Sequence, residues 1–261
     1  MIEIFFQLKF LNSIEEMKQS VTALLLFCMG LMSSVKLYSA SPYPLSPGDS
    51  LKSGQLIIVL TDNRDSIRAK LYCVEKKDGK WVTEFSFPVV VGEKGMTPHK
   101  SEGDLKAPSG IFDLGPAFGY ADKKDATWIH MRYLQATDTL ICVDDAGSLY
   151  YNQLIDSNSV LRDWHSRELM HLKNIYYKWG IFVQYNFQPA VKGNGSCIFI
   201  HIWGNENEGT EGCTAMEEKN ILKLLQWIRA EKNPKLIQYQ TDEYEKIAAE
   251  YKLPDLKPTT F

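Results

Sequence analysis

The chain has 261 residues, of which 44% are apolar and 23% are charged, values close to the average for soluble globular proteins. This composition argues against a chain that is disordered over most of its length. The net charge is −3 and lysine and arginine form no dense run. Nucleic acid is therefore excluded as a favoured partner, because its binding depends on a basic surface.

The first forty residues have the pattern of a targeting segment. Lys18 precedes an apolar stretch over residues 21–32, and small residues follow it. We expect residues 1–40 to be a signal peptide, with Met17 as an alternative start, followed by a Pro-rich linker over residues 41–53. The apolar stretch is too short to span a membrane. We therefore expect export to the periplasm or cell envelope without a stable membrane anchor.

Short strand-like runs dominate the chain after residue 54. Most are four to eight residues long, many contain β-branched or aromatic residues, and Gly, Pro or Asp separates them. The step Asp78-Gly79 is a strong hairpin signal between two of the runs. The predicted strands are residues 55–60, 67–74, 81–91, 110–114, 128–133, 140–143, 181–185, 198–203 and 235–239.

Two segments have the three- and four-residue apolar spacing of amphipathic helices, residues 166–179 and residues 217–229. A third and weaker helix is expected over residues 242–251, before Pro254 stops it. Helices are thus few compared with strands.

Many strands and few helices favour a mainly β fold, either a β-sandwich or a barrel. No sequence repeats at a fixed period, so neither a propeller nor a solenoid is expected. We place the domain over residues 54–240, with a helical insertion around residues 144–180. The remaining residues, 241–261, are predicted to form a C-terminal helical tail.

The stretch over residues 197–217 carries the most chemical information. His201 lies near the end of an apolar strand, and Cys213 follows a loop that contains three glycines. Thr214 and Glu217 have the spacing of a capping box, so we expect the second helix to begin at about Thr214. Cys213 would then stand immediately before the N-terminus of this helix.

That position has consequences for the chemistry of Cys213. The positive end of a helix dipole and its N–H groups favour the thiolate, which would lower the pKa of Cys213. The same N–H groups could bind an oxyanion, with Gly212 letting the backbone approach closely. With His201 as the base, the segment predicts a cysteine enzyme of the acyl-transfer type. The alternative is that this cysteine and this histidine are both structural.

The other cysteines offer one disulfide at most if Cys213 stays a free thiol. Cys28 would leave with the signal peptide, and the remaining three are Cys73, Cys142 and Cys197. The sequence does not select a pair among them. They fit equally well as small buried apolar residues on strands.

Four further histidines raise the question of a metal site: His99, His130, His165 and His171. No motif with metal-ligand spacing is present, and a helix would turn His165 and His171 to different faces. We therefore expect no metal and no other cofactor.

The stretch around Cys213 resembles the L,D-transpeptidase catalytic domain family, also called YkuD-like. The family pattern is a His, a glycine-bearing loop and then Ser/Thr-x-Gly-Cys, which His201 and Thr210-Glu211-Gly212-Cys213 match. Residues 102–112 are similar to the Gly-Asp-Gly-x-Thr-Pro-x-Gly-x-Phe segment of such domains. The resemblance spans roughly residues 54–240. Four segments are similar to a branch of the family with a long insertion: residues 116–120, 142–145, 151–152 and 213–216.

Two positions depart from the family pattern. Ala215 stands where many members have an Arg, and Glu211 stands where many have a His. That Arg is commonly thought to help position the site or the substrate. The departures therefore concern the geometry of the substrate and leave the nucleophile and the base in place.

The resemblance implies a barrel- or sandwich-like fold and a peptidoglycan stem peptide as substrate. Cys213 would attack the carbonyl between an L-centre and D-alanine in a tetrapeptide stem and release D-alanine. His201 would take the thiol proton and later activate an acceptor amine. The carbonyl of Ile202 would orient the His ring, while Gly212 and Thr210 would support the oxyanion.

The acceptor decides which reaction results. An amine would give cross-links, whereas water would make the protein an L,D-carboxypeptidase. A hydrolase of other amide bonds and a catalytically silent cell-wall binding module are further alternatives. The family resemblance also implies that a carbapenem would acylate Cys213.

Overall fold

The computed structural model describes residues 51–256, which belong to a single structural unit. The expected signal peptide, the alternative start at Met17 and all but the last three residues of the linker 41–53 lie outside the described residues. So do the last five residues of the predicted tail.

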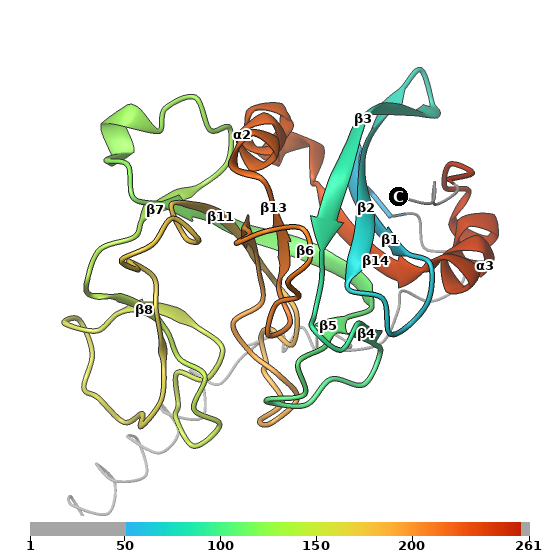
Figure 1. Cartoon of the computed structure of the whole chain (residues 1–261). Helices are drawn as coiled ribbons and strands as arrows, with labels where there is room; N and C mark the ends of the chain where they lie inside the picture. The colour runs from blue at the N-terminus through green and yellow to red at the C-terminus, as the bar shows by residue number, and fades with distance from the viewer. Residues whose placement is uncertain (1–50, 257–261) are drawn as a thin grey trace, which may run out of the picture. The chain divides into compact units, whose positions relative to one another are not determined.

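The largest sheet has nine strands in the order β11-β12-β13-β3-β2-β1-β14-β6-β7, and β11 also pairs with β6. This extra pairing joins one end of the sheet back to a strand near the other end, which gives the barrel-like arrangement in Figure 1. The predicted mainly β, barrel-like fold is confirmed. The strands are β1 Gln55–Thr61, β2 Arg68–Lys77, β3 Lys80–Val90, β6 Gly110–Gly119, β7 Tyr133–Gln135, β11 Trp179–Val183, β12 Phe199–Ile202, β13 Thr214–Met216 and β14 Lys235–Gln240.

The strand β1 is buried on both faces, as its continuous apolar run predicts. Ile57 and Val59 face one hydrophobic core, while Leu56, Ile58 and Leu60 face a second core. The strands β2 and β3 form the predicted hairpin. Asp78 and Gly79 in its turn both have positive φ, of 49° and 78°, as a tight two-residue turn requires.

One helix contributes to each of these cores (Figure 1). The helix α2, Glu218–Trp227, buries Ile221, Leu224 and Leu225 in the first core. The helix α3, Thr241–Tyr251, buries Tyr244 in the second core and confirms the third predicted helix. The two helices therefore cover opposite faces of the sheet at β1.

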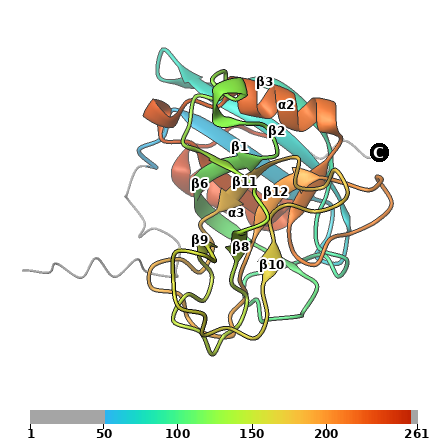
Figure 2. The same cartoon turned by 90° about the vertical axis from the view of Figure 1, so that its left-hand side faces the viewer.

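The helix predicted over residues 166–179 is wrong. Residues 144–180 contain no helix, and the strands β8 Leu140–Cys142, β9 Leu154–Asp156 and β10 Glu168–Leu169 form a separate three-stranded sheet (Figure 2). The apolar residues do not share one face. Leu169 and Tyr176 are exposed, Met170 and Tyr177 are buried, and Trp179 begins β11.

The remaining elements are short. They are the strands β4 Met96–Thr97 and β5 Ala107–Pro108 and the 3₁₀ turns η1 Lys123–Asp125 and η2 Ala230–Lys232. The predicted strand over residues 128–133 overlaps β7 only at Tyr133. The residues before it form a loop, from which Ile129 packs into the first core.

Candidate active site

His201 is held on the fully buried strand β12, between β11 and β13. Its ring Nδ1 lies 2.8 Å from the carbonyl oxygen of Ile202. Because a carbonyl only accepts hydrogen bonds, Nδ1 must carry the proton, which leaves Nε2 of the neutral ring as an acceptor. Burial lowers the pKa of His201 to about 4, although the bond to Ile202 acts in the opposite direction. His201 is therefore neutral at neutral pH.

Cys213 lies at the entry to β13, and only 8% of its surface is exposed. The backbone N–H of Phe199 donates to its Sγ at 3.3 Å, and the thiol lies 3.7 Å from the carbonyl oxygen of Cys197. Burial raises the pKa of Cys213 far above its ordinary value, and the nearby carboxylate of Glu168 raises it further. The resting thiol is therefore protonated.

The predicted helix start at Thr214, and with it the expected lowering of the Cys213 pKa, is wrong. Thr214 belongs to β13, and α2 begins only at Glu218. The Thr214 hydroxyl donates to Oε1 of Gln238 at 2.6 Å instead of capping the helix. The N-cap residue of α2 is Glu217, whose side chain makes no capping bond. The strand thus separates the thiol from the helix dipole.

The strands β12 and β13 bring His201 and Cys213 to the same face of the sheet. They pair in parallel with His201 opposite Ala215, and Cys213 precedes Ala215 by two residues. The Tyr177 ring contacts His201 edge-on, with the ring centroids 5.3 Å apart, and packs in one hydrophobic cluster with Cys213. No hydrogen bond joins His201 to Cys213 within residues 51–256, because the thiol points to the Cys197 carbonyl.

Thr210 fixes the turn that precedes Cys213. Its Oγ1 donates to the Cys213 carbonyl at 2.6 Å and accepts the N–H of Gly212 at 3.1 Å. Gly212 has a φ of 143°, and a Cβ on it would lie 2.9 Å from the carbonyl oxygen of Lys106. The predicted close approach of the backbone at Gly212 is thus made toward a neighbouring loop, and its N–H is engaged by Thr210.

Glu168 and Tyr177 belong to the site, although the sequence did not reveal them. The Tyr177 hydroxyl donates to Oε2 of Glu168 at 2.5 Å, and the same tyrosine contacts His201. Burial raises the pKa of Glu168 to about 7, and the charges of Asp144 and Glu211 add to the effect. The mistaken helix over residues 166–179 contains both residues, and helical spacing gave no reason to connect them with Cys213 and His201.

A disulfide between Cys142 and Cys197 links the insertion to the segment that leads into β12. Among the pairs that the sequence left open, this is the one that forms, and Cys73 is a buried free thiol. The Cys197 N–H donates to Oδ1 of Asn152 at 2.9 Å. Asn152 in turn donates to the carbonyls of Tyr185 and Asn186. The disulfide anchors the side chain of Cys197 and Asn152 anchors its N–H. Together they fix the backbone carbonyl of Cys197, which faces the Cys213 thiol.

Over residues 51–256, no group of three or more His, Cys, Asp or Glu side chains is placed to hold a metal ion. His171 pairs with Asp138 at 2.7 Å, and the helix predicted over residues 166–179, which contains His171, is absent. None of the helices in this part of the chain has both the length and the hydropathy needed to cross a membrane.

Comparison with known proteins gives a match to one family model. The model of the L,D-transpeptidase catalytic domain, YkuD, matches residues 57–237. No curated protein sequence is similar enough to count as a match.

Two solved structures are similar to the chain. The helical cell shape determining protein Pgp2 from Campylobacter jejuni has 20% identity and a TM-score of 0.38, with 74% of this chain and 52% of that chain covered. Bd1075 from Bdellovibrio bacteriovorus has 16% identity and a TM-score of 0.40, with 77% and 55% covered. This chain therefore spans about half the length of each. Because the family model covers most of the chain and includes both His201 and Cys213, the chain belongs to the L,D-transpeptidase catalytic domain family.

Proposed function

We propose that the protein is a cysteine acyltransferase that acts on peptidoglycan stem peptides, with Cys213 as nucleophile and His201 as base. One observation carries the proposal: the two residues lie on the same face of adjacent strands within the family domain. The bond from Nδ1 to Ile202 leaves Nε2 as the ring atom that can accept a proton. The expected export to the periplasm or cell envelope is part of this proposal, because the stems lie there.

The protonation states fit the first step of acyl transfer. Sγ of Cys213 attacks the carbonyl carbon of the bond between the L-centre and D-alanine, and the thiol proton passes to Nε2 of His201. That proton then moves to the leaving amine as the C–N bond breaks, which leaves a thioester. In the second step His201 deprotonates an acceptor amine, the amine attacks the thioester, and the proton returns to the sulfur. No metal or cofactor takes part in this scheme.

The resting arrangement must change before attack, because the thiol faces the Cys197 carbonyl. We propose that substrate binding turns the thiol from this carbonyl toward Nε2 of His201. The turn fixed by Thr210 would then present its backbone N–H groups to the oxyanion, with Gly212 releasing its bond to Thr210. Ile202 keeps its role of orienting the imidazole ring throughout.

A catalytically silent cell-wall binding module is the second candidate. The burial of Cys213 and the lack of a bond between its thiol and His201 favour it. An L,D-carboxypeptidase uses the same residues with water as acceptor, and a hydrolase of another amide bond differs only in the bond that it cleaves. These candidates separate by their products.

The test is product analysis of purified tetrapeptide stems incubated with wild type, Cys213→Ala and Cys73→Ala. Among residues 51–256, Cys73 is the other free thiol and is also buried, so it provides a matched control. We expect wild type and Cys73→Ala to release D-alanine and form cross-links, and Cys213→Ala to do neither. Release without cross-links would indicate a carboxypeptidase. No product with wild type would favour the binding module. A carbapenem is expected to add its mass to Cys213 in wild type and Cys73→Ala, and to leave Cys213→Ala unmodified.

A further inference from the structure

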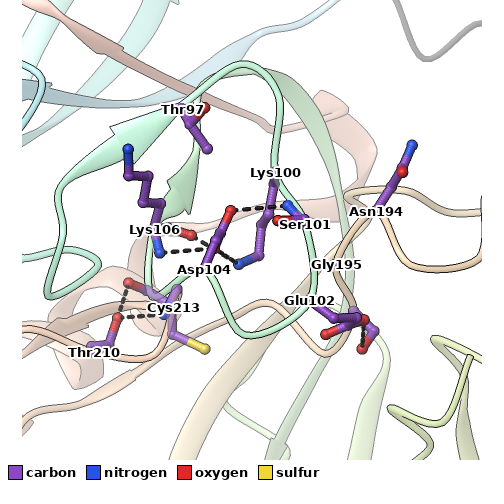
Figure 3. Close-up of polar contacts among 12 residues, drawn as sticks. Thr97, Lys100, Ser101, Glu102, Asp104, Lys106, Asn194, Gly195, Thr210 and Cys213 are labelled. Atoms are coloured by element: carbon purple, nitrogen blue, oxygen red, sulfur yellow. Dashed lines mark hydrogen bonds and ion pairs between the residues drawn. The ribbon is translucent and has the colours of Figure 1, made fainter.

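A buried cation, Lys100, lies against the segment that carries Cys213 (Figure 3). Only 3% of its side chain is exposed, and its Nζ donates to Oδ1 of Asp104 at 2.7 Å and to the Lys106 carbonyl at 2.9 Å. Burying an ammonium is costly unless it is paired and hydrogen-bonded. The ion pair with Asp104 meets this condition and fixes where the charge sits.

The Lys100 side chain fills the space between the two backbone segments that lead into β12 and β13. On one side, a Cβ on Gly195 would lie 2.8 Å from its methylene carbons. On the other side, a Cβ on Gly212 would lie 3.0 Å from its Nζ. The first segment continues to Cys197, whose carbonyl faces the thiol, and the second continues to Cys213 itself. Lys100 thus sets the spacing between the Cys213 thiol and the Cys197 carbonyl that it faces.

Several charged or titratable groups face the thiol, and they act in opposite directions. Glu168 and Glu211 disfavour the thiolate, while Lys100 favours it. The neutral side chains of Tyr177 and His201, which contact each other, lie on the same side of the sheet as the Cys213 thiol. Burial makes the Cys213 thiolate unfavourable, and the Lys100 ammonium offsets part of this effect on the thiol pKa.

We propose that Lys100 is a positioning residue of the nucleophile: it holds the Gly212–Cys213 backbone in register, and its ammonium favours negative charge on the sulfur. The inference rests on the proposed role of Cys213. It adds a residue that the motif around Cys213 does not contain, supplied by a loop more than a hundred positions earlier in the chain.

The test compares Lys100→Met with Asp104→Asn, which break the same ion pair from opposite ends. Lys100→Met removes the positive charge and keeps an apolar stem of similar length. Asp104→Asn keeps the ammonium and removes its counter-charge. The measured quantity is the rate of iodoacetamide addition to Cys213 from about pH 6 to about pH 10, followed by peptide mass spectrometry. The melting temperature of each variant reports on the fold.

We expect Lys100→Met to raise the apparent pKa of Cys213 by about one unit, so that alkylation at a fixed pH slows roughly tenfold. Asp104→Asn should change reactivity in the opposite direction. A shift of the same sign and similar size in both variants would mean that the loop has only a structural role and would overturn the proposal, as would no shift in either. If Lys100→Met fails to fold, faster alkylation of Asp104→Asn supports the proposal and unchanged or slower alkylation overturns it.

Alkylation needs no peptidoglycan substrate, so this result is separate from the fate of the proposed function. If Cys213→Ala still processed stems, the acyltransfer role of Cys213 would fail whatever the alkylation rates were. If Cys213 is essential for stem turnover but both variants alkylate like wild type, the role of Lys100 fails alone.

Discussion

Loss of the disulfide between Cys142 and Cys197 is expected to lower both the stability of the domain and the order around the thiol. The two cysteines are separated by 55 residues. For a loop of this length, the chain-entropy relation gives a stabilisation of about 4 kcal/mol. In a domain of roughly 200 residues, each kcal/mol shifts the melting temperature by about 2–4 °C. We therefore expect the variant Cys142→Ala/Cys197→Ala to melt roughly 8–16 °C below wild type.

The assay is thermal unfolding of wild type and of the double variant, each with and without dithiothreitol. Alanine is chosen because both cysteines are buried and a serine would add buried hydroxyls. Reductant should have no further effect on the double variant, since Cys73 and Cys213, its remaining cysteines among residues 51–256, are already free. Alkylation of Cys213 should speed up, because the disulfide no longer helps to hold the backbone carbonyl of position 197 against the thiol. A drop of less than about 2 °C, or equal sensitivity of both proteins to reductant, would refute this reasoning.

Three further predictions concern the backbone and the titrating groups of the site. Gly212→Ala adds a Cβ 2.9 Å from the Lys106 carbonyl at a φ of 143°, and we expect it to lose about 2–4 kcal/mol of unfolding free energy. Gly193→Ala, with φ 85° and open space around it, should lose about 1 kcal/mol, and equal losses would contradict the clash. The pKa of Glu168 is raised to about 7, so its own contribution to the stability should fall as pH rises from 4.5 through about 7, seen as the difference in urea midpoint between wild type and Glu168→Gln. Glu168→Gln should flatten that fall, and an unchanged slope would argue against it. The pKa of His201 is lowered to about 4, so its own contribution to the stability should be lost as pH falls from 6.5 toward about 4, opposite in sign to that of Glu168 over the shared range. His201→Asn should lose less over that range, and a parallel curve would show that His201 is not the titrating group.

Much of the fold could be predicted because its signals are local. The apolar run of β1 is too uniform for a half-exposed strand, and it is buried on both faces. The Asp78-Gly79 step supplies the positive φ values that its hairpin needs. The helix α3 follows its own spacing of apolar residues and ends at Tyr251, shortly before Pro254. Each of these features depends on neighbours in the sequence.

The errors arose where distant contacts decided the structure. Residues 166–179 have helical spacing, but the pairing of β10 with β8 and of β11 with β12 pulls the segment into extended chain. Thr214 has the spacing of a capping residue, but its hydroxyl is taken by Gln238 from β14. In both cases the partner strand could be predicted from its own residues, but its contact with this segment is long-range and no local pattern identifies it.

The proposal that His201 and Cys213 act together followed from the sequence, but the electrostatics around them did not. The helix-terminus argument predicted a lowered pKa for Cys213, whereas burial and Glu168 raise it. Burial depends on the assembled core, and Glu168 reaches the thiol from a segment that was assigned to a helix. Lys100 was missed because its loop meets Gly212 only after the sheet has formed.

The claim that Cys213 forms an acyl-enzyme is best tested by intact-protein mass spectrometry after mixing with a tetrapeptide stem and quenching in acid. We expect a mass increase equal to the stem without its D-alanine, mapped by proteolysis to the peptide that contains Cys213. The increase should be absent in Cys213→Ala and present in Cys73→Ala. Release of D-alanine with no adduct at any quench time, or an adduct at another residue, would contradict the claim.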